Sequence, residues 1–202
     1  MNIKIKNIWL HLRKIQIHRK WVRHYCFGIG LYKQGLFHDL SKYSPTEFWE
    51  SVKYYQGTSS PIDASKAENG YSMAWFHHRG RNLHHHVMWI DNFDETGGTP
   101  ILMPYKYFAE MICDYLAAGR AYMGKKFSFV AENEWWKKKR AKGLAMPENQ
   151  MKMIDFIFNQ LAEREERDGM AWTEKWLTKS IGGQTLILTT YNYYKEHNVC
   201  LD

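Results

Sequence analysis

The sequence predicts an all-α fold, and three observations support this. Apolar residues recur at helical spacing over residues 3–27, and neither Gly nor Pro interrupts them. Ser44, Pro45 and Glu47 form a helix start signal, namely an N-cap, a proline at the first helical position and a capping-box glutamate. A well-patterned amphipathic segment begins at Pro147. We therefore expect a helical bundle.

The first half of the chain predicts three helices and a loop. The helix over 3–27 ends at Gly28 and Gly30, and a short helix follows over 31–40, with a His-Asp pair near its C-terminal end. The helix that begins after Ser44 continues to about residue 55. The stretch 56–70 is rich in Gly, Ser and Pro, which predicts a loop with room for one helical turn and a role in a lid.

Further helices are expected downstream. Residues 71–78 and 83–93 predict two short helical pieces around "RGRN", and residues 94–100 predict a loop. Helices are also expected from Pro104 to about Met123 and in the charged stretch "ENEWWKKKRAK". The segment 182–199 is ambiguous, because its Thr, Ile and Tyr residues favour a strand while its length and surroundings favour a helix.

Length and composition indicate one globular domain over residues 1–202, with 45% hydrophobic and 24% charged residues. No stretch approaches the roughly 18 consecutive apolar residues of a membrane span, and the basic start lacks the apolar block of a secretory signal. Cys26, Cys113 and Cys200 lie far apart, which predicts reduced thiols in a cytoplasmic protein without membrane association. The net charge of +7 favours anionic ligands without singling out nucleic acid.

Histidines and aspartates that suit a metal gather at five places in the sequence. These are His18, the His38-Asp39 pair, the His77-His78 pair, the run from His84 to His86, and Asp114. Each has an ordinary alternative, since a lone histidine is more often hydrogen-bonded than metal-bound, and a His-Asp pair can cap a helix. Together they predict a site for one or two divalent ions, because imidazole and carboxylate ligands suit Fe, Mn, Zn or Mg.

Three of these places resemble the motifs of a known superfamily. "HRKWV" from His18 and "LFHDLSK" from Leu36 resemble the first two motifs of the HD superfamily of metal-dependent phosphohydrolases, with Lys42 at the motif's lysine position and Ser41 in place of its usual glycine. Residues 110–125, "EMICDYLAAGRAYMGK", are similar to the helix that ends the metal site in HD and especially HD-GYP proteins, with Asp114 at the ligand position. The GYP tripeptide itself is absent.

The resemblance covers about residues 18–125. It implies an HD-like helical bundle with a metal-site core at about 11–125 and a C-terminal helical extension at about 126–202. The pattern "HHRGRNLHHH" together with "HDLSKYSP" also resembles a small bacterial and phage family, for which the resemblance implies no biochemical function. His24 is an alternative first ligand, but it lies on a different helix face from His18 and lacks the downstream Val, so we prefer His18.

The resemblance implies a metal-dependent phosphohydrolase that acts on an anionic small molecule with a phosphate ester, a nucleotide being one candidate. The implied metal ligands are His18, His38, Asp39, Asp114 and either His84 or His85, with a further ligand from His77 or His78. Asp39 would bridge the metals, and Lys42 would contact the substrate phosphate. Arg79, Arg81 and Arg120 are further candidates for contacts to an anion.

Two other functions fit the sequence. Some HD-like proteins use a di-iron centre to oxygenate a substrate with molecular oxygen, and the same ligands would serve that chemistry. The chain could instead be a non-enzymatic basic module that binds nucleic acid or protein through "WWKKKRAK", which combines stacking aromatics with basic residues. The substrate, the metal and the oligomeric state are not encoded in any pattern that we recognise.

Overall fold

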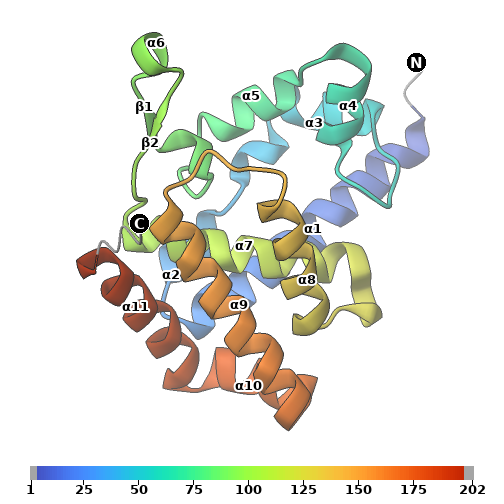
Figure 1. The fold of residues 1–202 in the computed structure, drawn as a ribbon. Helices are drawn as coiled ribbons and strands as arrows, with labels where there is room; N and C mark the ends of the chain where they lie inside the picture. Colours follow the sequence, from blue (N-terminus) through green and yellow to red (C-terminus); the bar gives the residue numbers. More distant parts are fainter. Residues whose placement is uncertain (1–3, 198–202) are drawn as a thin grey trace.

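The computed structural model describes residues 4–197, apart from the side chains of residues 95 and 96. It confirms the all-α prediction, since helices carry nearly all of its regular structure (Figure 1). The α-helices are α1 (Ile5–Gly28), α2 (Tyr32–Phe37), α3 (Pro45–Lys53), α4 (Pro61–Asn69), α5 (Met73–Arg79), α6 (Phe93–Thr96), α7 (Tyr105–Met123), α8 (Phe129–Arg140), α9 (Glu148–Asp168), α10 (Met170–Lys179) and α11 (Ile181–Glu196). Three short 3-10 helices, η1 (Leu40–Tyr43), η2 (His86–Met88) and η3 (Gly124–Lys126), and an antiparallel pair of strands, β1 (Ile90–Asp91) and β2 (Thr99–Pro100), complete the described part.

Helices α1 and α7 pack against each other at the centre of the molecule (Figure 1). The buried residues of α1 follow one helical stripe, with His11, Ile15, His18 and Val22 spaced by three or four residues. Helix α7 is buried on nearly every side between Phe108 and Ala121. Two histidines therefore lie in an otherwise apolar stripe that faces the most buried helix of the fold.

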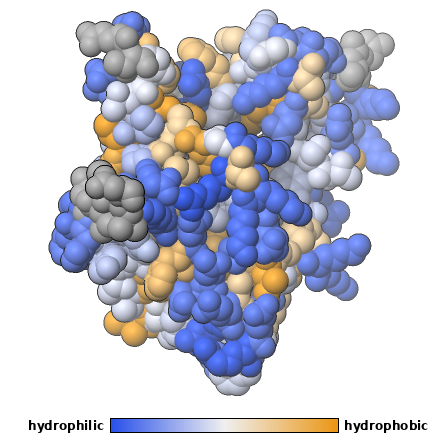
Figure 2. All heavy atoms as spheres, in the orientation of Figure 1, coloured by the Kyte–Doolittle hydropathy of each residue, from blue (hydrophilic) through white to orange (hydrophobic). Residues whose placement is uncertain are grey.

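The C-terminal helices cover the other side of α7 and share one core with it. That core joins residues of α1, α7, α8, α9, α10 and α11, with Trp136, Phe129 and Phe158 among its largest fully buried side chains. The ambiguous segment after residue 181 forms helix α11, because Ile187 and Tyr191 pack into this core. On the face shown in Figure 2, hydrophilic side chains cover most of α9 and the end where α9 meets α10.

Helices α3, α4 and α5 form a layer on the opposite side of α1 (Figure 1). Part of this layer differs from the sequence prediction, because residues 61–69 are helical rather than a loop. The hydroxyl of Ser60 accepts the backbone N–H of Ile62, and Gly70 ends the helix with a left-handed φ of 80°. This is the same Ser-Pro start signal as at Ser44, and the Gly- and Ser-rich composition concealed it.

The predicted helical piece over 83–93 is also wrong beyond its single turn of η2. The chain instead forms the β1–β2 hairpin, in which Ile90 pairs with Pro100, and Asn92 adopts a left-handed φ of 54° that ends the strand. Cross-strand pairing thus replaces the local helical pattern.

Cys26 and Cys113 are free and buried, whereas Cys200 lies outside the described residues. Among residues 4–197, the helices are too short or too polar to cross a membrane.

The contact between α1 and α10 gives a stability prediction. A Cβ atom at Gly28 would lie 2.5 Å from the Cα atom of Thr178, so the Gly28→Ala variant must push the two helices apart. We expect a loss of roughly 1–3 kcal/mol in the free energy of unfolding, measured by chemical denaturation. Gly80→Ala is the control, because its Cβ would meet the nearest atom at 3.4 Å. Equal stability of the two variants would contradict the close helix contact.

Candidate metal centre

The His38-Asp39 pair lies in a sharp turn between α2 and η1. Asp39 adopts a left-handed conformation with φ 55° and ψ 27°, which non-glycine residues seldom adopt and which aspartate tolerates better than most. Arg19 of α1 donates hydrogen bonds to the carbonyl oxygens of His38 and Leu36, both at 2.9 Å. The turn is thereby fixed to α1, and the side chains of His38 and Asp39 are buried, with 2% and 1% exposure.

A first cluster of metal-ligand type gathers around one oxygen of Asp39. It consists of His18, His38, Asp39 and Asp114, each with a nitrogen or oxygen atom within 4.8 Å of the others. The Nε2 atom of His18 lies 3.0 Å from Asp114 Oδ1 and 3.5 Å from Asp39 Oδ2. The Nε2 atom of His38 lies 3.3 Å from the same Oδ2. Helix α1, the turn after α2 and helix α7 thus meet at one point.

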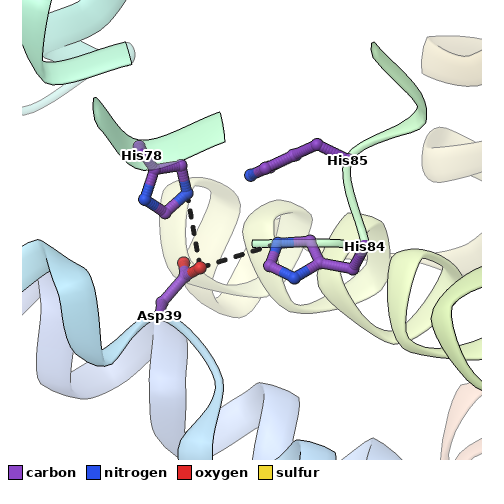
Figure 3. Close-up of side chains that lie close together, drawn as sticks. All are labelled: Asp39, His78, His84 and His85. Carbon is purple, nitrogen blue, oxygen red and sulfur yellow. Dashed lines mark ion pairs between the residues drawn. The ribbon is translucent and has the colours of Figure 1, made fainter. Parts of the chain in front are cut away.

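A second cluster gathers around the other oxygen of Asp39 (Figure 3). Its members are Asp39, His78, His84 and His85, again with ligand atoms within 4.8 Å of one another. The Nε2 atoms of His78 and His84 lie 3.3 and 3.6 Å from Asp39 Oδ1. The two oxygens of one carboxylate therefore face two different groups of donors, which is the arrangement of a bridging ligand.

Most of the facing atoms in the two clusters lack hydrogen-bond partners. Buried side-chain atoms without a partner in the described residues include Nε2 of His18, His38, His84 and His85, and both carboxylate oxygens of Asp39. An unpaired buried polar group costs roughly 1–3 kcal/mol, so such groups are rare and are usually satisfied by another species. Nitrogen and oxygen donors that converge in this way fit one or two divalent ions.

Two buried carboxylates behind the clusters orient the histidines. Glu110, one turn before Asp114 on α7, contacts Nδ1 of His38 at 2.9 Å and Nδ1 of His84 at 3.3 Å. Glu47 of α3 contacts Nδ1 of His78 at 2.8 Å. A histidine that donates its Nδ1–H to a carboxylate presents the lone pair of Nε2 on the other side of the ring. Glu110 can also form a third donor group with His38 and His84, but its short contacts are those of hydrogen bonds.

The role of Glu47 differs from the sequence prediction. The predicted cap is present, since Ser44 Oγ accepts the backbone N–H of Glu47 at 3.4 Å. The Glu47 carboxylate, however, contacts the Nδ1 atoms of His77 and His78 instead of closing a capping box. His77 lies 2.6 Å from this carboxylate and outside both clusters, so its position does not support the predicted role as a metal ligand.

Charge in the clusters keeps the carboxylates anionic and acts differently on the histidines. Burial would lower the pKa of His38, but Asp39 and then Asp114 and Glu110 raise it well above its usual value. Burial alone would raise the pKa of Asp39, but the charges of His38 and Lys42 outweigh it and hold this pKa well below its usual value. The pKa of Asp114 is likewise low, because contacts with His18 and His38 outweigh its burial. Burial and then the neighbouring histidines hold the pKa of His85 well below its usual value. Asp39 and Asp114 are therefore anionic, and His85 is neutral.

Lys42 and a pocket lie on one side of the clusters. The Nζ atom of Lys42 is 2.5 Å from Asp39 Oδ2. Burial would lower the pKa of Lys42, but Asp39 and Asp114 raise it, so Lys42 is cationic. A cavity of about 220 Å³ begins here and is lined at its inner end by His18, Lys42, His78, His85 and Asp114. A small molecule in this cavity would contact both clusters.

The three arginines predicted to contact an anion lie in different places. Arg120 donates to the hydroxyl of Tyr25 at 3.0 Å and pairs with Glu174, which ties α7 to α1 and α10 away from the cavity. Arg79 packs over the Phe76 ring at 5.2 Å. Arg81 is exposed and borders a second hollow, which His38, His84 and Glu110 also line. Of these three arginines, Arg81 alone shares a pocket with histidines of the clusters in the described part of the chain.

The position of His24 agrees with the choice of His18 as the first ligand. Its Nε2 atom lies 3.0 Å from Glu174 Oε1, on the side of α1 that faces α10.

The sequence interpretation overlooked three residues that support the clusters, namely Arg19, Glu110, and Glu47 as the carboxylate that contacts the histidines of α5. A signal existed for Glu110, because it lies four residues before Asp114 and hence on the same face of the predicted helix.

The basic stretch "WWKKKRAK" is largely engaged within the protein. Trp136 is fully buried, and its Nε1–H donates to Asp155 at 2.7 Å. Arg140 pairs with Glu148 and Asp155, and Lys139 lies over the rings of Tyr115 and Trp135. Trp136 is thus unavailable for stacking with a nucleic-acid base, whereas Trp135 is 40% exposed.

The fold and the site define a helical protein with a candidate centre for two metal ions. The model of the family of unknown function DUF5662 matches residues 7–179, which include both clusters and the carboxylates behind them. The chain belongs to this family. No curated protein and no solved structure matches the chain.

The carboxylates behind the histidines give a prediction about metal affinity. Replacing Glu47 or Glu110 by Gln removes the anionic acceptor that orients the histidines. We expect each change to weaken the binding of Mn²⁺ or Zn²⁺ about 10- to 100-fold in competition with a chelator. Glu163→Gln, an exposed change on α9, is the control and should bind like the original chain. Affinities of Glu47→Gln and Glu110→Gln equal to the control would argue against this arrangement.

Proposed function

We propose that this protein is a metal-dependent phosphohydrolase that acts on a phosphate ester. The observation that carries the proposal is the shared carboxylate, because Asp39 faces two donor clusters while Lys42 and an open cavity lie beside it. The residues that converge are also those whose motifs resemble the HD superfamily. We therefore propose an HD-like site, with the chain as an enzyme.

The cofactor in this proposal is a pair of divalent ions, Fe, Mn, Zn or Mg. One ion would be held by His18, His38 and Asp114, and the other by His78, His84 and His85, with Asp39 common to both. Such ions, when bound, lower the pKa of water and stabilise negative charge on phosphoryl oxygens. The donor groups come from α1, α5, α7 and two connecting segments, so the packed helices fix the spacing of the site.

The residues around the ions complete the proposed chemistry. One water is consumed, its oxygen forms a bond to phosphorus, and the ester P–O bond breaks to leave an alcohol that takes up a proton. Lys42 lies where its charge would stabilise a phosphoryl group next to Asp39, and it acts as a point charge. The net charge of +7 suits an anionic substrate, and a nucleotide is one candidate. We place the protein in the cytoplasm, where free Cys26 and Cys113 would stay reduced.

Separate variants of Lys42 and His38 test this proposal. Lys42→Ala should keep most of the bound metal but lose turnover by roughly 10²–10³-fold, because its charge acts more strongly in the transition state than in the resting enzyme. His38→Ala should lose metal and activity together, since a donor of the first cluster is gone. Lys138→Ala, an exposed change on α8, should alter neither property.

The measurements are metal content by elemental analysis and phosphate release from a panel of nucleotides and simple phosphate esters. Absence of phosphate release from every ester by the metal-loaded protein would refute the hydrolase proposal. Iron in the purified protein, together with substrate-dependent oxygen consumption, would instead support the di-iron oxygenase alternative. Salt-sensitive nucleic-acid binding that survives removal of metal would support a binding module.

A further inference from the structure

The cavity beside the clusters has an inner end of metal-ligand type and mainly apolar walls. The apolar wall residues come from α1, α4, α5 and α7 and include Ile15, Pro61, Ile62, Trp75, Ala118 and Tyr122. The volume of about 220 Å³ lies below the range of roughly 300–1,000 Å³ that is typical of pockets for drug-sized ligands. A molecule bound in this cavity is therefore small, and most of its surface contacts apolar side chains.

Several polar groups on these walls are engaged by the protein itself. Lys14 Nζ donates to the carbonyl oxygen of Ala121 at 2.9 Å. Ser60 Oγ accepts the N–H of Ile62, and Glu47 holds the two neighbouring histidines of α5. A sugar in this space would lose hydrogen bonds to water and find few replacements, which costs free energy for each unpaired hydroxyl.

Other polar side chains on the wall are Ser51, Tyr122 and His11, and the Nδ1 atom of His11 is buried without a hydrogen-bond partner in the described residues. Burial, and then the charge of Lys42, lowers the pKa of His11 to about 4. Its ring packs against Phe48 and Tyr55 at 5.5 and 5.8 Å between ring centroids. His11 thus adds an aromatic surface rather than a positive charge, and the cationic groups of the cavity are Lys42 at its inner end and Lys14.

Trp75 gives this cavity a fixed aromatic wall. One contact of its ring is with His85 of the second cluster, at 4.8 Å between centroids, and Lys66 lies over the ring at 4.8 Å. Helix α4 supplies Pro61 and Ile62 opposite, so the segment expected to be a loop forms part of the wall. An aromatic or aliphatic group next to the clusters would pack against Trp75 and Ile62.

We propose that this cavity selects phosphate monoesters of small aromatic or aliphatic alcohols in preference to nucleotides. This inference rests on the proposed function, because the phosphate is assigned to the clusters and Lys42. The apolar cavity beside Lys42 would accept one substituent of the phosphorus, and its volume suits one ring. A nucleotide would add a ribose and a base, which exceed that space and bring unpaired hydroxyl groups.

Binding of non-hydrolysable analogues tests the cavity independently of turnover. Phenylphosphonate should bind to the metal-loaded protein at least tenfold more tightly than methylphosphonate in calorimetric titrations, since its ring is buried. Ile62→Trp should fill the cavity and remove this difference while metal content is unchanged. Ile181→Trp, at an exposed position on α11, is the matched control and should keep the difference. Equal affinity for the two phosphonates would overturn the inference, as would an unchanged preference in Ile62→Trp.

Turnover then distinguishes failure of this inference from failure of the proposed function. The kcat/KM for phenyl phosphate should exceed that for adenosine monophosphate by at least tenfold. Faster hydrolysis of the nucleotide would overturn the proposed selectivity and leave the hydrolase proposal standing. Tight, Ile62-dependent binding of phenylphosphonate without hydrolysis of any ester would support the ligand class and refute the hydrolase.

Discussion

The buried carboxylate of Asp39 is the constraint on which the rest of the site depends. Its two oxygens face separate groups of donors, and in the described residues neither makes a hydrogen bond of regular geometry, although Oδ2 forms an ion pair with Lys42. A buried carboxylate without compensation is strongly unfavourable, so the surrounding positive charge has to be substantial. Lys42 and the histidines supply part of it, and divalent ions between the donors would supply the remainder. The left-handed backbone at Asp39 is held by the contacts of Arg19 with the same turn.

The fold serves this constraint through two layers of helices. The packing of α1 on α7 brings His18 to Asp114, and α3 and α5 bring His78 to Asp39 with Glu47 behind it. The C-terminal helices contribute indirectly, because their shared core buries α7 and so fixes the position of Asp114. The geometry of the site is therefore set by packing between helices, and Arg19 adds a direct link between α1 and the turn that holds Asp39.

Much of the fold and part of the candidate site follow from local patterns. Helical spacing and start signals predicted α1, α7 and α9 closely, because each buries a regularly spaced set of apolar residues. Helix α4 was missed, since its start signal lies in a composition typical of loops, and the β1–β2 hairpin depends on pairing that local periodicity does not contain.

The roles of single charged residues were less predictable. Glu47 fitted the pattern of a capping box, and its backbone N–H does donate to Ser44. Its carboxylate instead contacts His78 of α5, and this tertiary contact is not visible in the local sequence. Arg120 was predicted to contact an anion because of its residue type alone. Its partners are instead Tyr25 and Glu174, which come from distant parts of the chain. The convergence of His18, His38, Asp39 and Asp114 depends on tertiary contacts between distant segments, which local sequence patterns do not contain; only the resemblance to HD motifs predicted that these residues would meet.

Anomalous X-ray diffraction from crystals of the Mn²⁺-loaded protein is the most direct measurement of the central claim. The account predicts two strong peaks, one on each side of the Asp39 carboxylate, with nitrogen or oxygen contacts at about 2.0–2.3 Å. The first peak should contact His18 and Asp114, and the second should contact His78 and His84. Peaks elsewhere on the protein, or no ordered metal near Asp39, would contradict the shared-carboxylate centre.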